Sequence, residues 1–212
     1  MKLATLAITL GFFLIGPIPA TFAQVGKSQG LADVNTASEA DLLKAPHMTP
    51  SIVKAIISGR AFASIVDLNK LLLAQKLTPE QATAFYEKAF VHINLNTATA
   101  DEIMLIPRAG KRMAHEFEEY RPWRTWAQFD KEIGKYVNAQ ETARLAQYGF
   151  IPINLNTASD ADILTIPGVA QRMLHEFKEY RPWKTGAQFD KEIGKYVDQK
   201  EVQRLKRYVV IP

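Results

Sequence analysis

Apolar side chains recur at helical spacing along most of the chain. Met113, Phe117 and Tyr120 follow one another at steps of four and three residues, and the same steps return from Met173 to Tyr180. This spacing places the side chains on one face of an α-helix. Runs of strictly alternating apolar and polar residues are too short to predict the strands of a sheet. The pattern therefore predicts an all-α fold.

The chain also repeats itself, with a period of 60 residues between Pro107 and Pro167. HEFEEYRPWRTWAQFDKEIGKYV at 115–137 returns as HEFKEYRPWKTGAQFDKEIGKYV at 175–197, and a fainter copy opens at 33–37 with DVNTA. A fixed period of this length is typical of tandem structural units. We expect three of them: repeat 1 at residues 30–92, repeat 2 at 93–152 and repeat 3 at 153–212.

Polar residues mark helix starts in each repeat. A Ser, Thr, Asn or Asp side chain can bond the free N–H groups of a first helical turn, and an acid or amide three residues later can bond back. Nine such pairs stand at matched positions: Ser38/Asp41, Thr99/Glu102, Ser159/Asp162, Ser64/Asp67, Thr125/Gln128, Thr185/Gln188, Thr78/Gln81, Asn138/Glu141 and Asp198/Glu201. Adding the helices after the proline-containing turns, at about Pro50, Lys111 and Gln171, predicts four helices per repeat. The last two in each are expected at 65–73 and 79–89, 126–133 and 139–148, and 186–193 and 199–207.

The duplicated passage is rich in large aromatic residues, which usually pack inward when they recur at helical spacing. The expected core therefore includes Phe117, Tyr120, Trp123, Phe129, Ile133 and Tyr136, together with Phe177, Tyr180, Trp183, Phe189, Ile193 and Tyr196. On this interpretation the duplication preserves a piece of scaffold. A duplicated active site and a duplicated grip on a long partner are the alternatives.

Residues 1–23 have the layout of a secretory signal peptide. A lysine precedes an apolar run from Leu3 to Ile18, and Thr21-Phe22-Ala23 offers small residues for cleavage. We expect cleavage near Ala23 and a protein that is periplasmic or secreted. A membrane anchor is the alternative, although the run is shorter than the roughly 20 residues that span a bilayer. No later apolar run approaches that length, so we expect no membrane span after the leader.

Composition and charge narrow the chemistry. The chain has no cysteine, which excludes disulfides and lipid attachment at Cys. Its net charge of +4 is distributed as 7 − 6 = +1 over residues 24–92, 8 − 8 = 0 over 93–152 and 10 − 8 = +2 over 153–212, with Lys2 in the leader. The sequence has no His-Glu-x-x-His motif and no phosphate loop, and His115 and His175 lack further ligands at useful spacing. We therefore expect no catalytic site, no metal site and no cofactor.

The proline-containing turns carry a resemblance to a known family. Ile153-Asn-Leu-Asn-Thr-Ala-Ser159 is followed by Ile166-Pro-Gly-Val-Ala170 and Arg172. This resembles the helix-hairpin-helix proteins, most closely the small secreted ComEA-type domains of competence DNA uptake. The likeness extends over all three repeats, and the later Gly134-Lys135 and Gly194-Lys195 resemble the family's second, degenerate hairpin. It implies sequence-independent binding of double-stranded DNA, with helix-hairpin-helix pairs in each four-helix unit.

The turns also suit phosphate on physical grounds. The first N–H groups of a helix lack partners and carry partial positive charge, and contacts of this kind hold the DNA backbone without reading the bases. The residues expected at DNA are Arg108, Ala109, Gly110, Lys111, Arg112, Gly168, Val169, Ala170, Gln171 and Arg172, with Gly134, Lys135, Gly194 and Lys195 from the second hairpins.

Departures from the family pattern leave a second interpretation open. The two hairpin glycines of the family are His47 and Thr49 in repeat 1, so we expect that repeat not to bind phosphate. Repeats 2 and 3 keep one glycine each, Gly110 and Gly168. The lost glycines and the near-neutral charge favour a non-catalytic periplasmic protein-interaction or structural module, whose partner would be a protein. The tandem array and the basic repeat 3 favour DNA.

Overall fold

The computed structural model describes residues 30–211, and this part of the chain is mostly helical. The expected leader, residues 1–23, lies outside the described range. None of the helices within that range has the length and apolar character that crossing a bilayer requires. The prediction of a mainly α-helical protein is confirmed.

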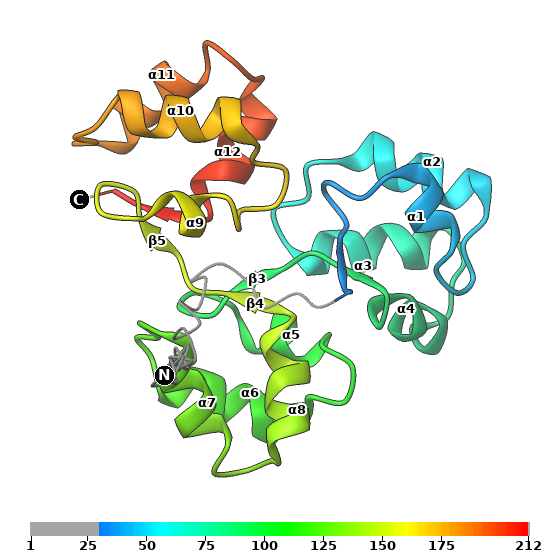
Figure 1. Cartoon of the computed structure of the whole chain (residues 1–212). Coiled ribbons are helices and arrows are strands. Elements are labelled where there is room, and N and C mark those ends of the chain that lie inside the picture. The colour runs from blue at the N-terminus through cyan, green and yellow to red at the C-terminus, as the bar shows by residue number, and fades with distance from the viewer. Residues whose placement is uncertain (1–29, 212) are drawn as a thin grey trace, which may run out of the picture.

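The same order of elements occurs three times, with a short strand, four helices and a second short strand in each turn of the pattern. The first comprises β1 (Ala32–Asp33), α1 (Glu39–Leu43), α2 (Pro50–Gly59), α3 (Ile65–Ala74), α4 (Pro79–Tyr86) and β2 (Ala89–Phe90). The second comprises β3 (Ile93–Asn94), α5 (Ala100–Met104), α6 (Gly110–Glu119), α7 (Trp126–Ile133), α8 (Ala139–Ala146) and β4 (Gly149–Phe150). The third comprises β5 (Ile153–Asn154), α9 (Asp160–Ile163), α10 (Gln171–Glu179), α11 (Gly186–Ile193), α12 (Gln199–Lys206) and β6 (Val209–Val210). Figure 1 shows the three groups of helices as separate lobes.

Each group of four helices is closed by a parallel pairing of its first and last strands, which the sequence pattern did not predict. Ala32 lies opposite Ala89, and the pairs β3–β4 and β5–β6 repeat this register. Two residues are too few to show alternation, so period-two patterning cannot detect such strands. The strands also correct the expected ends of the fourth helices. The chain leaves α4, α8 and α12 at Tyr86, Ala146 and Lys206 to reach the paired strand.

The nine predicted helix starts all receive a side-chain cap. In each case the polar side chain accepts a hydrogen bond from a backbone N–H of the first turn. Within the described chain, the reciprocal bond of a full capping box is present only at Thr78, Thr99 and Ser159. Elsewhere the third residue has another partner; Glu141 and Glu201, for example, bind Arg144 and Arg204. The start signal is therefore local, whereas the partner of the third residue depends on its surroundings.

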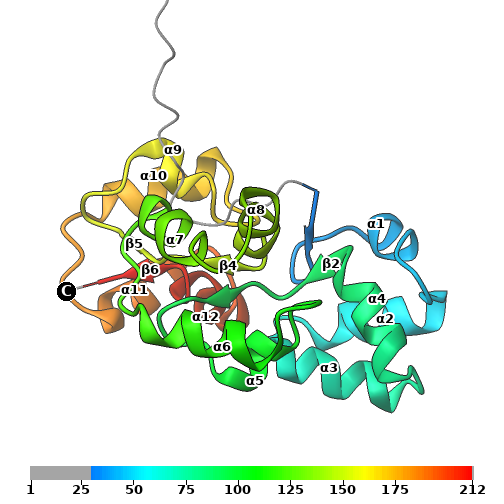
Figure 2. The same cartoon turned by 90° about the horizontal axis from the view of Figure 1, so that it is seen from below.

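The expected core is confirmed for eight of its twelve members, those without a hydroxyl. Phe117, Trp123, Phe129, Ile133 and their counterparts in repeat 3 are buried, whereas the four tyrosines are half-buried and pair through their hydroxyls. Buried side chains of repeats 1 and 2 form one continuous cluster, and repeat 3 has a cluster of its own that begins at Phe150. The view turned by 90° in Figure 2 shows the lobe of α1–α4 projecting beside the other two.

Candidate nucleic-acid interface

The residue after the turn proline has the same backbone conformation in all three repeats. His47, Arg108 and Gly168 have φ angles of 62°, 64° and 79°. This left-handed conformation costs a non-glycine residue roughly 1–2 kcal/mol, so the turn keeps its shape in repeats 1 and 2 despite the loss of glycine. The second glycine position differs. Thr49 and Ala170 are extended with φ of −117°, and only in repeat 2, where Gly110 has φ of 69°, does a described turn require glycine there.

The helices that follow the turns of repeats 2 and 3 begin without a side-chain cap. Ala109 and Ala170 occupy the cap positions of α6 and α10 and offer no hydrogen bond. Each of the other ten helices in the described chain has a capping side chain. In repeat 1 that side chain is Thr49, whose hydroxyl accepts a bond from Ile52 N at 3.3 Å. The free N–H groups and the positive end of the helix dipole are therefore presented at α6 and α10.

Cationic side chains stand at these two helix starts, and no acidic residue lies in either first turn. Lys111, Arg112 and Arg172 are exposed and have no ion pair in the described part of the chain. The guanidinium of Arg112 lies 5.3 Å from the centre of the Tyr136 ring, and that of Arg172 lies 5.8 Å from the centre of the Tyr196 ring. Both arginines are thus oriented by an aromatic face. The structure brings the predicted turn, helix start and cations of each repeat together.

The turns of repeats 2 and 3 also contact other parts of the molecule. Arg108 is 3.8 Å from Glu87 of repeat 1 and 3.9 Å from Glu141, which weakens its attraction for phosphate. A Cβ added to Gly168 would lie 3.0 Å from Thr36 Cγ2 of repeat 1. One side of each turn therefore faces its neighbours, while Gly110, Ala170 and the first-turn cations stay exposed.

The second hairpins are less suited to phosphate than the sequence suggested. Gly134 and Gly194 end α7 and α11 as their C-caps. Lys135 and Lys195 are ion-paired with Glu132 and Glu192, and the hydrogen bond that each lysine donates to its glutamate raises the pKa of the lysine. The helices that follow are capped by Asn138 and Asp198. In these turns the two lysines are already paired, and a cap already bonds one first-turn N–H of each following helix.

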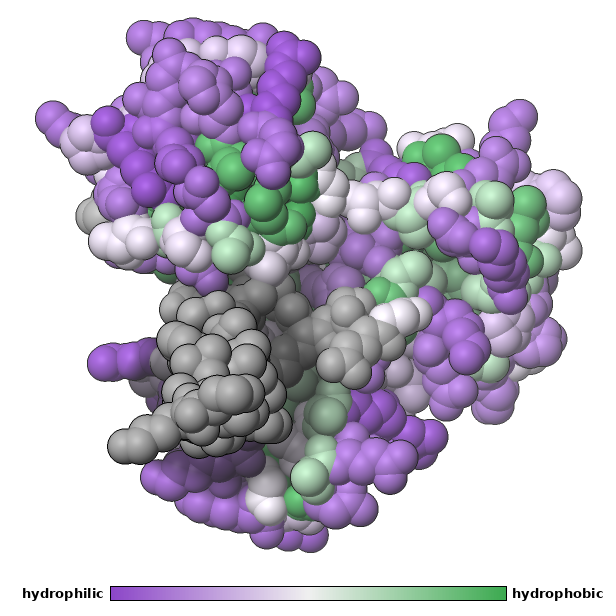
Figure 3. Space-filling model, viewed as in Figure 1, coloured by the Kyte–Doolittle hydropathy of each residue, from purple (hydrophilic) through white to green (hydrophobic). Residues whose placement is uncertain are grey.

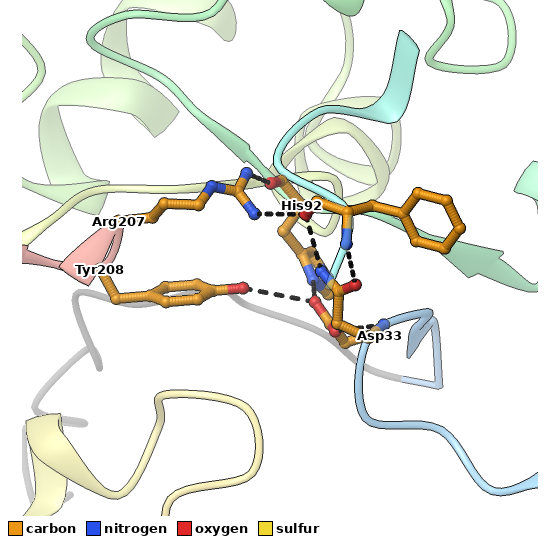
Figure 4. Close-up of polar contacts among 6 residues, drawn as sticks. Asp33, His92, Arg207 and Tyr208 are labelled. Atoms are coloured by element: carbon orange, nitrogen blue, oxygen red, sulfur yellow. Dashed lines mark hydrogen bonds and ion pairs between the residues drawn. The ribbon is translucent and has the colours of Figure 1, made fainter. Parts of the chain in front are cut away.

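A buried polar cluster joins repeat 1 to repeat 3 (Figure 4). One carboxylate oxygen of Asp33 lies 2.8 Å from His92 Nδ1 and accepts a hydrogen bond from the Tyr208 hydroxyl at 3.3 Å. Arg207 donates to the backbone oxygens of His92 at 2.8 Å and Phe62 at 3.4 Å. Burial alone raises the pKa of Asp33, but the hydrogen bond and charge of His92, with the charge of Arg204, hold that pKa below its ordinary value.

Sequence reasoning missed this cluster, because its members lie far apart in the chain. Asp33 and Tyr208 are separated by 175 residues. One signal was present in the sequence: Asp33 stands where repeats 2 and 3 have Asn94 and Asn154. The backbone role of this position is shared, since each side chain accepts a bond from the N–H two residues later. The carboxylate of repeat 1 is thus an addition to a common turn.

The surface and side-chain groupings give little sign of other chemistry. No three His, Cys, Asp or Glu side chains in the described residues are grouped to hold a metal ion. On the face shown in Figure 3 the surface is mostly hydrophilic, and hydrophobic residues appear in small, separate patches. The uncapped starts of α6 and α10 are therefore the features that point to a ligand most directly.

Comparison with known proteins supplies no further guide. The chain matches no protein-family model, no curated protein and no solved structure.

Proposed function

We propose that the protein binds double-stranded DNA, independently of sequence, through the turns and helix starts of repeats 2 and 3, as a tandem array on a helix-hairpin-helix scaffold. Backbone N–H groups at the starts of α6 and α10 meet phosphate oxygens, and Lys111, Arg112 and Arg172 add side-chain charge. Such contacts hold the sugar–phosphate chain and ignore base identity. In keeping with the leader-like residues 1–23, the DNA is met in the periplasm or outside the cell, as in DNA uptake.

The observation that carries this proposal is the pattern of caps. Ten helix starts in the described chain are closed by a side chain, and the two left open are those at the turns of repeats 2 and 3. A capping side chain would occupy one of the N–H groups that a phosphate needs and would stand in the place of its oxygen. Repeat 1, which has lost both glycines, is closed by Thr49. Its turn is therefore not part of the proposed site.

Each site is weak on this proposal, and linkage supplies part of the affinity. Three first-turn cations release few counterions, so the logarithm of the binding constant should fall with the logarithm of salt concentration at a slope of about −3 or shallower. Two sites on one chain raise the strength of the whole without any new contact.

The decisive test places a negative charge at an open helix start. Ala170 already has the extended backbone of a cap residue, so Ala170→Asp should close α10 and repel phosphate together. We expect a large loss of duplex retardation in a gel-shift series over salt, with unchanged helix content by circular dichroism. Ala170→Ser, which caps without charge, should lose less.

Two further variants set the limits of this test. Replacing Lys111, Arg112 and Arg172 together by Ala should abolish retardation. Thr49→Ala in repeat 1 should leave it unchanged, because that helix start takes no part. If the chain beginning at residue 24 fails to retard duplex DNA even at low salt, the DNA proposal is wrong.

The second candidate is a non-catalytic protein-interaction or structural module. The ion pair of Arg108 with Glu87 and the closeness of Thr36 to Gly168, which leaves little room for a Cβ there, favour it, because both lie between repeats. If the protein fails to retard duplex DNA, this candidate takes the place of the DNA proposal, with a periplasmic protein as the partner.

A further inference from the structure

A cavity of about 540 Å³ lies between repeats 1 and 3, away from the helix starts of α6 and α10. One wall is the segment that joins α2 to α3, with Arg60 and Phe62. The other wall is the outer face of α12 and the residue after it, with Lys200, Gln203, Arg204 and Arg207. We refer to it as the inter-repeat cleft. Its volume lies in the range of small-molecule sites.

The inter-repeat cleft is lined by four cations and by no acidic residue. Arg204 is neutralised by Glu201, whose carboxylate lies 2.7 Å away. Arg60 and Arg207 instead bind backbone oxygens, at Ala37 and at Phe62 and His92. Those bonds fix the guanidinium groups without a directly bound carboxylate, and the acidic group that acts on Arg60 is the buried Asp33, which is already bonded to His92 and Tyr208. Lys200 is exposed and has no ion pair in the described chain.

Comparison of α12 with α8 shows that the charge is not a property of the scaffold. Lys200, Gln203 and Arg207 correspond, 60 residues earlier, to Gln140, Ala143 and Gln147. The two cations are thus peculiar to repeat 3, which is also the repeat whose α12 faces repeat 1 across the cleft. Arg204 is shared with repeat 2 as Arg144 and pairs with a glutamate in both. The difference between the helices therefore concentrates positive charge at this wall.

We propose that the inter-repeat cleft binds a small organic anion, a carboxylate or a phosphate ester carried on an apolar body. Arg207, Arg60 and Lys200 supply charge and N–H donors for the oxyanion, because guanidinium groups bind carboxylate and phosphate with paired hydrogen bonds. Phe62 and the alanines beside it, Ala61 and Ala63, supply an apolar surface for the rest of the ligand. The site is separate from the proposed DNA contacts and does not depend on them.

Calorimetric titration of the chain beginning at residue 24 tests this proposal with four probes. Phenyl phosphate and phenylacetate each carry an anion on an aromatic ring, and comparing them separates a phosphate site from a carboxylate site. Inorganic phosphate lacks the apolar part, and benzyl alcohol lacks the charge. We expect at least one of the two aromatic anions to bind about tenfold more tightly than either incomplete probe. A tenfold change in affinity is what one charge-assisted hydrogen bond typically contributes.

A charge series at one exposed position locates the binding. Gln203 is exposed on α12, so neither Gln203→Glu nor Gln203→Lys should disturb the fold. We expect Gln203→Glu to weaken binding of the preferred anion about tenfold and Gln203→Lys to strengthen it. Ala143→Glu, at the equivalent position of α8, is the matched control and should change nothing.

The proposal is overturned if neither aromatic anion binds at millimolar concentration. It is equally overturned if Gln203→Glu and Gln203→Lys leave the affinity unchanged, or if Ala143→Glu weakens binding as much as Gln203→Glu. Retardation of duplex DNA should be unaffected by Gln203→Glu, which keeps this result distinct from the DNA test.

Discussion

At the scale of single residues, the most consequential side chain is the Asp33 carboxylate. It is 8% exposed and is bonded by His92, the last residue of repeat 1, and by Tyr208 of repeat 3. Burying a carboxylate is costly unless it is bonded and paired. Here the partners outweigh the cost, since the pKa of Asp33 lies below 3.8, its ordinary value. The stability of this contact between repeats 1 and 3 therefore depends on whether Asp33 is protonated.

This linkage predicts a loss of stability in acid. A carboxyl group whose pKa is lowered on folding stabilises the fold above its unfolded pKa, and that contribution is lost as the pH falls through the folded pKa. Asp33→Asn keeps the turn that Asn94 and Asn154 form but removes the charge. We expect it to lower the free energy of unfolding at pH 7 by about 1–3 kcal/mol, measured by urea denaturation.

The difference between the two proteins should shrink as the pH falls below about 4, the ordinary pKa of an aspartate in an unfolded chain, because the unfolded wild type then binds a proton that the folded carboxylate resists. Asn94→Asp in repeat 2 is not an equivalent change and is not the control. The control is Asn154→Ala, which removes the side-chain hydrogen bond of the turn without removing a charge. Its effect on the free energy of unfolding should show no such pH dependence. A constant difference between wild type and Asp33→Asn from pH 7 to acid would contradict the linkage.

At the scale of elements, helix starts differ in what closes them. Thr49 closes α2, whereas α6 begins at Gly110 in a left-handed conformation after the uncapped Ala109. Arg108 has a left-handed φ as well, so two of three successive residues in this turn are left-handed, on either side of Ala109. The start of α6 thus requires left-handed backbone angles, and no side chain caps its first N–H groups. Stability given up at such a place is consistent with a binding role.

In the turn of repeat 2, removing the glycine at position 110 should therefore destabilise the fold, and introducing a glycine at position 108 should stabilise it. Gly110→Ala should cost about 1 kcal/mol in unfolding free energy, since φ is 69° and no atom lies within 4 Å of the added Cβ. Arg108→Gly should gain a similar amount by relieving the same conformation. Thermal unfolding followed by circular dichroism measures both. A stabilising Gly110→Ala would show that the turn is shaped differently.

At the scale of the whole molecule, the repeats are joined by a recurring aromatic contact. Phe90 packs on Tyr148 with ring centres 5.0 Å apart, and Phe150 packs on Tyr208 at 4.3 Å. The matching positions at the ends of the described array are Lys88 and Val210, so neither end offers the same ring pair. Within the described chain, the Phe–Tyr contact therefore joins repeat 1 to repeat 2 and repeat 2 to repeat 3.

Removing the second contact should uncouple repeat 3. Phe150 is fully buried and belongs to the cluster of repeat 3, although its strand closes repeat 2. We expect Phe150→Ala to cost about 3–5 kcal/mol and to expose the segment around residue 152 to limited proteolysis. Val210→Ala, at the equivalent position that is exposed and has no ring partner, is the control and should change little. Resistance of the Phe150→Ala protein to cleavage there would show that other contacts hold repeat 3.

The sequence by itself determined the 60-residue period, the helical character, nine capped helix starts and the buried Phe and Trp residues of the duplicated passage. Each of these depends on residues a few positions apart, which local spacing records. The tertiary structure alone decided the strand pairs, the Asp33 cluster and the inter-repeat cleft, because their members come from distant segments. It also decided which helix starts remain open and which lysines are already paired. Those depend on what surrounds a group once the repeats have packed, and local spacing does not record that.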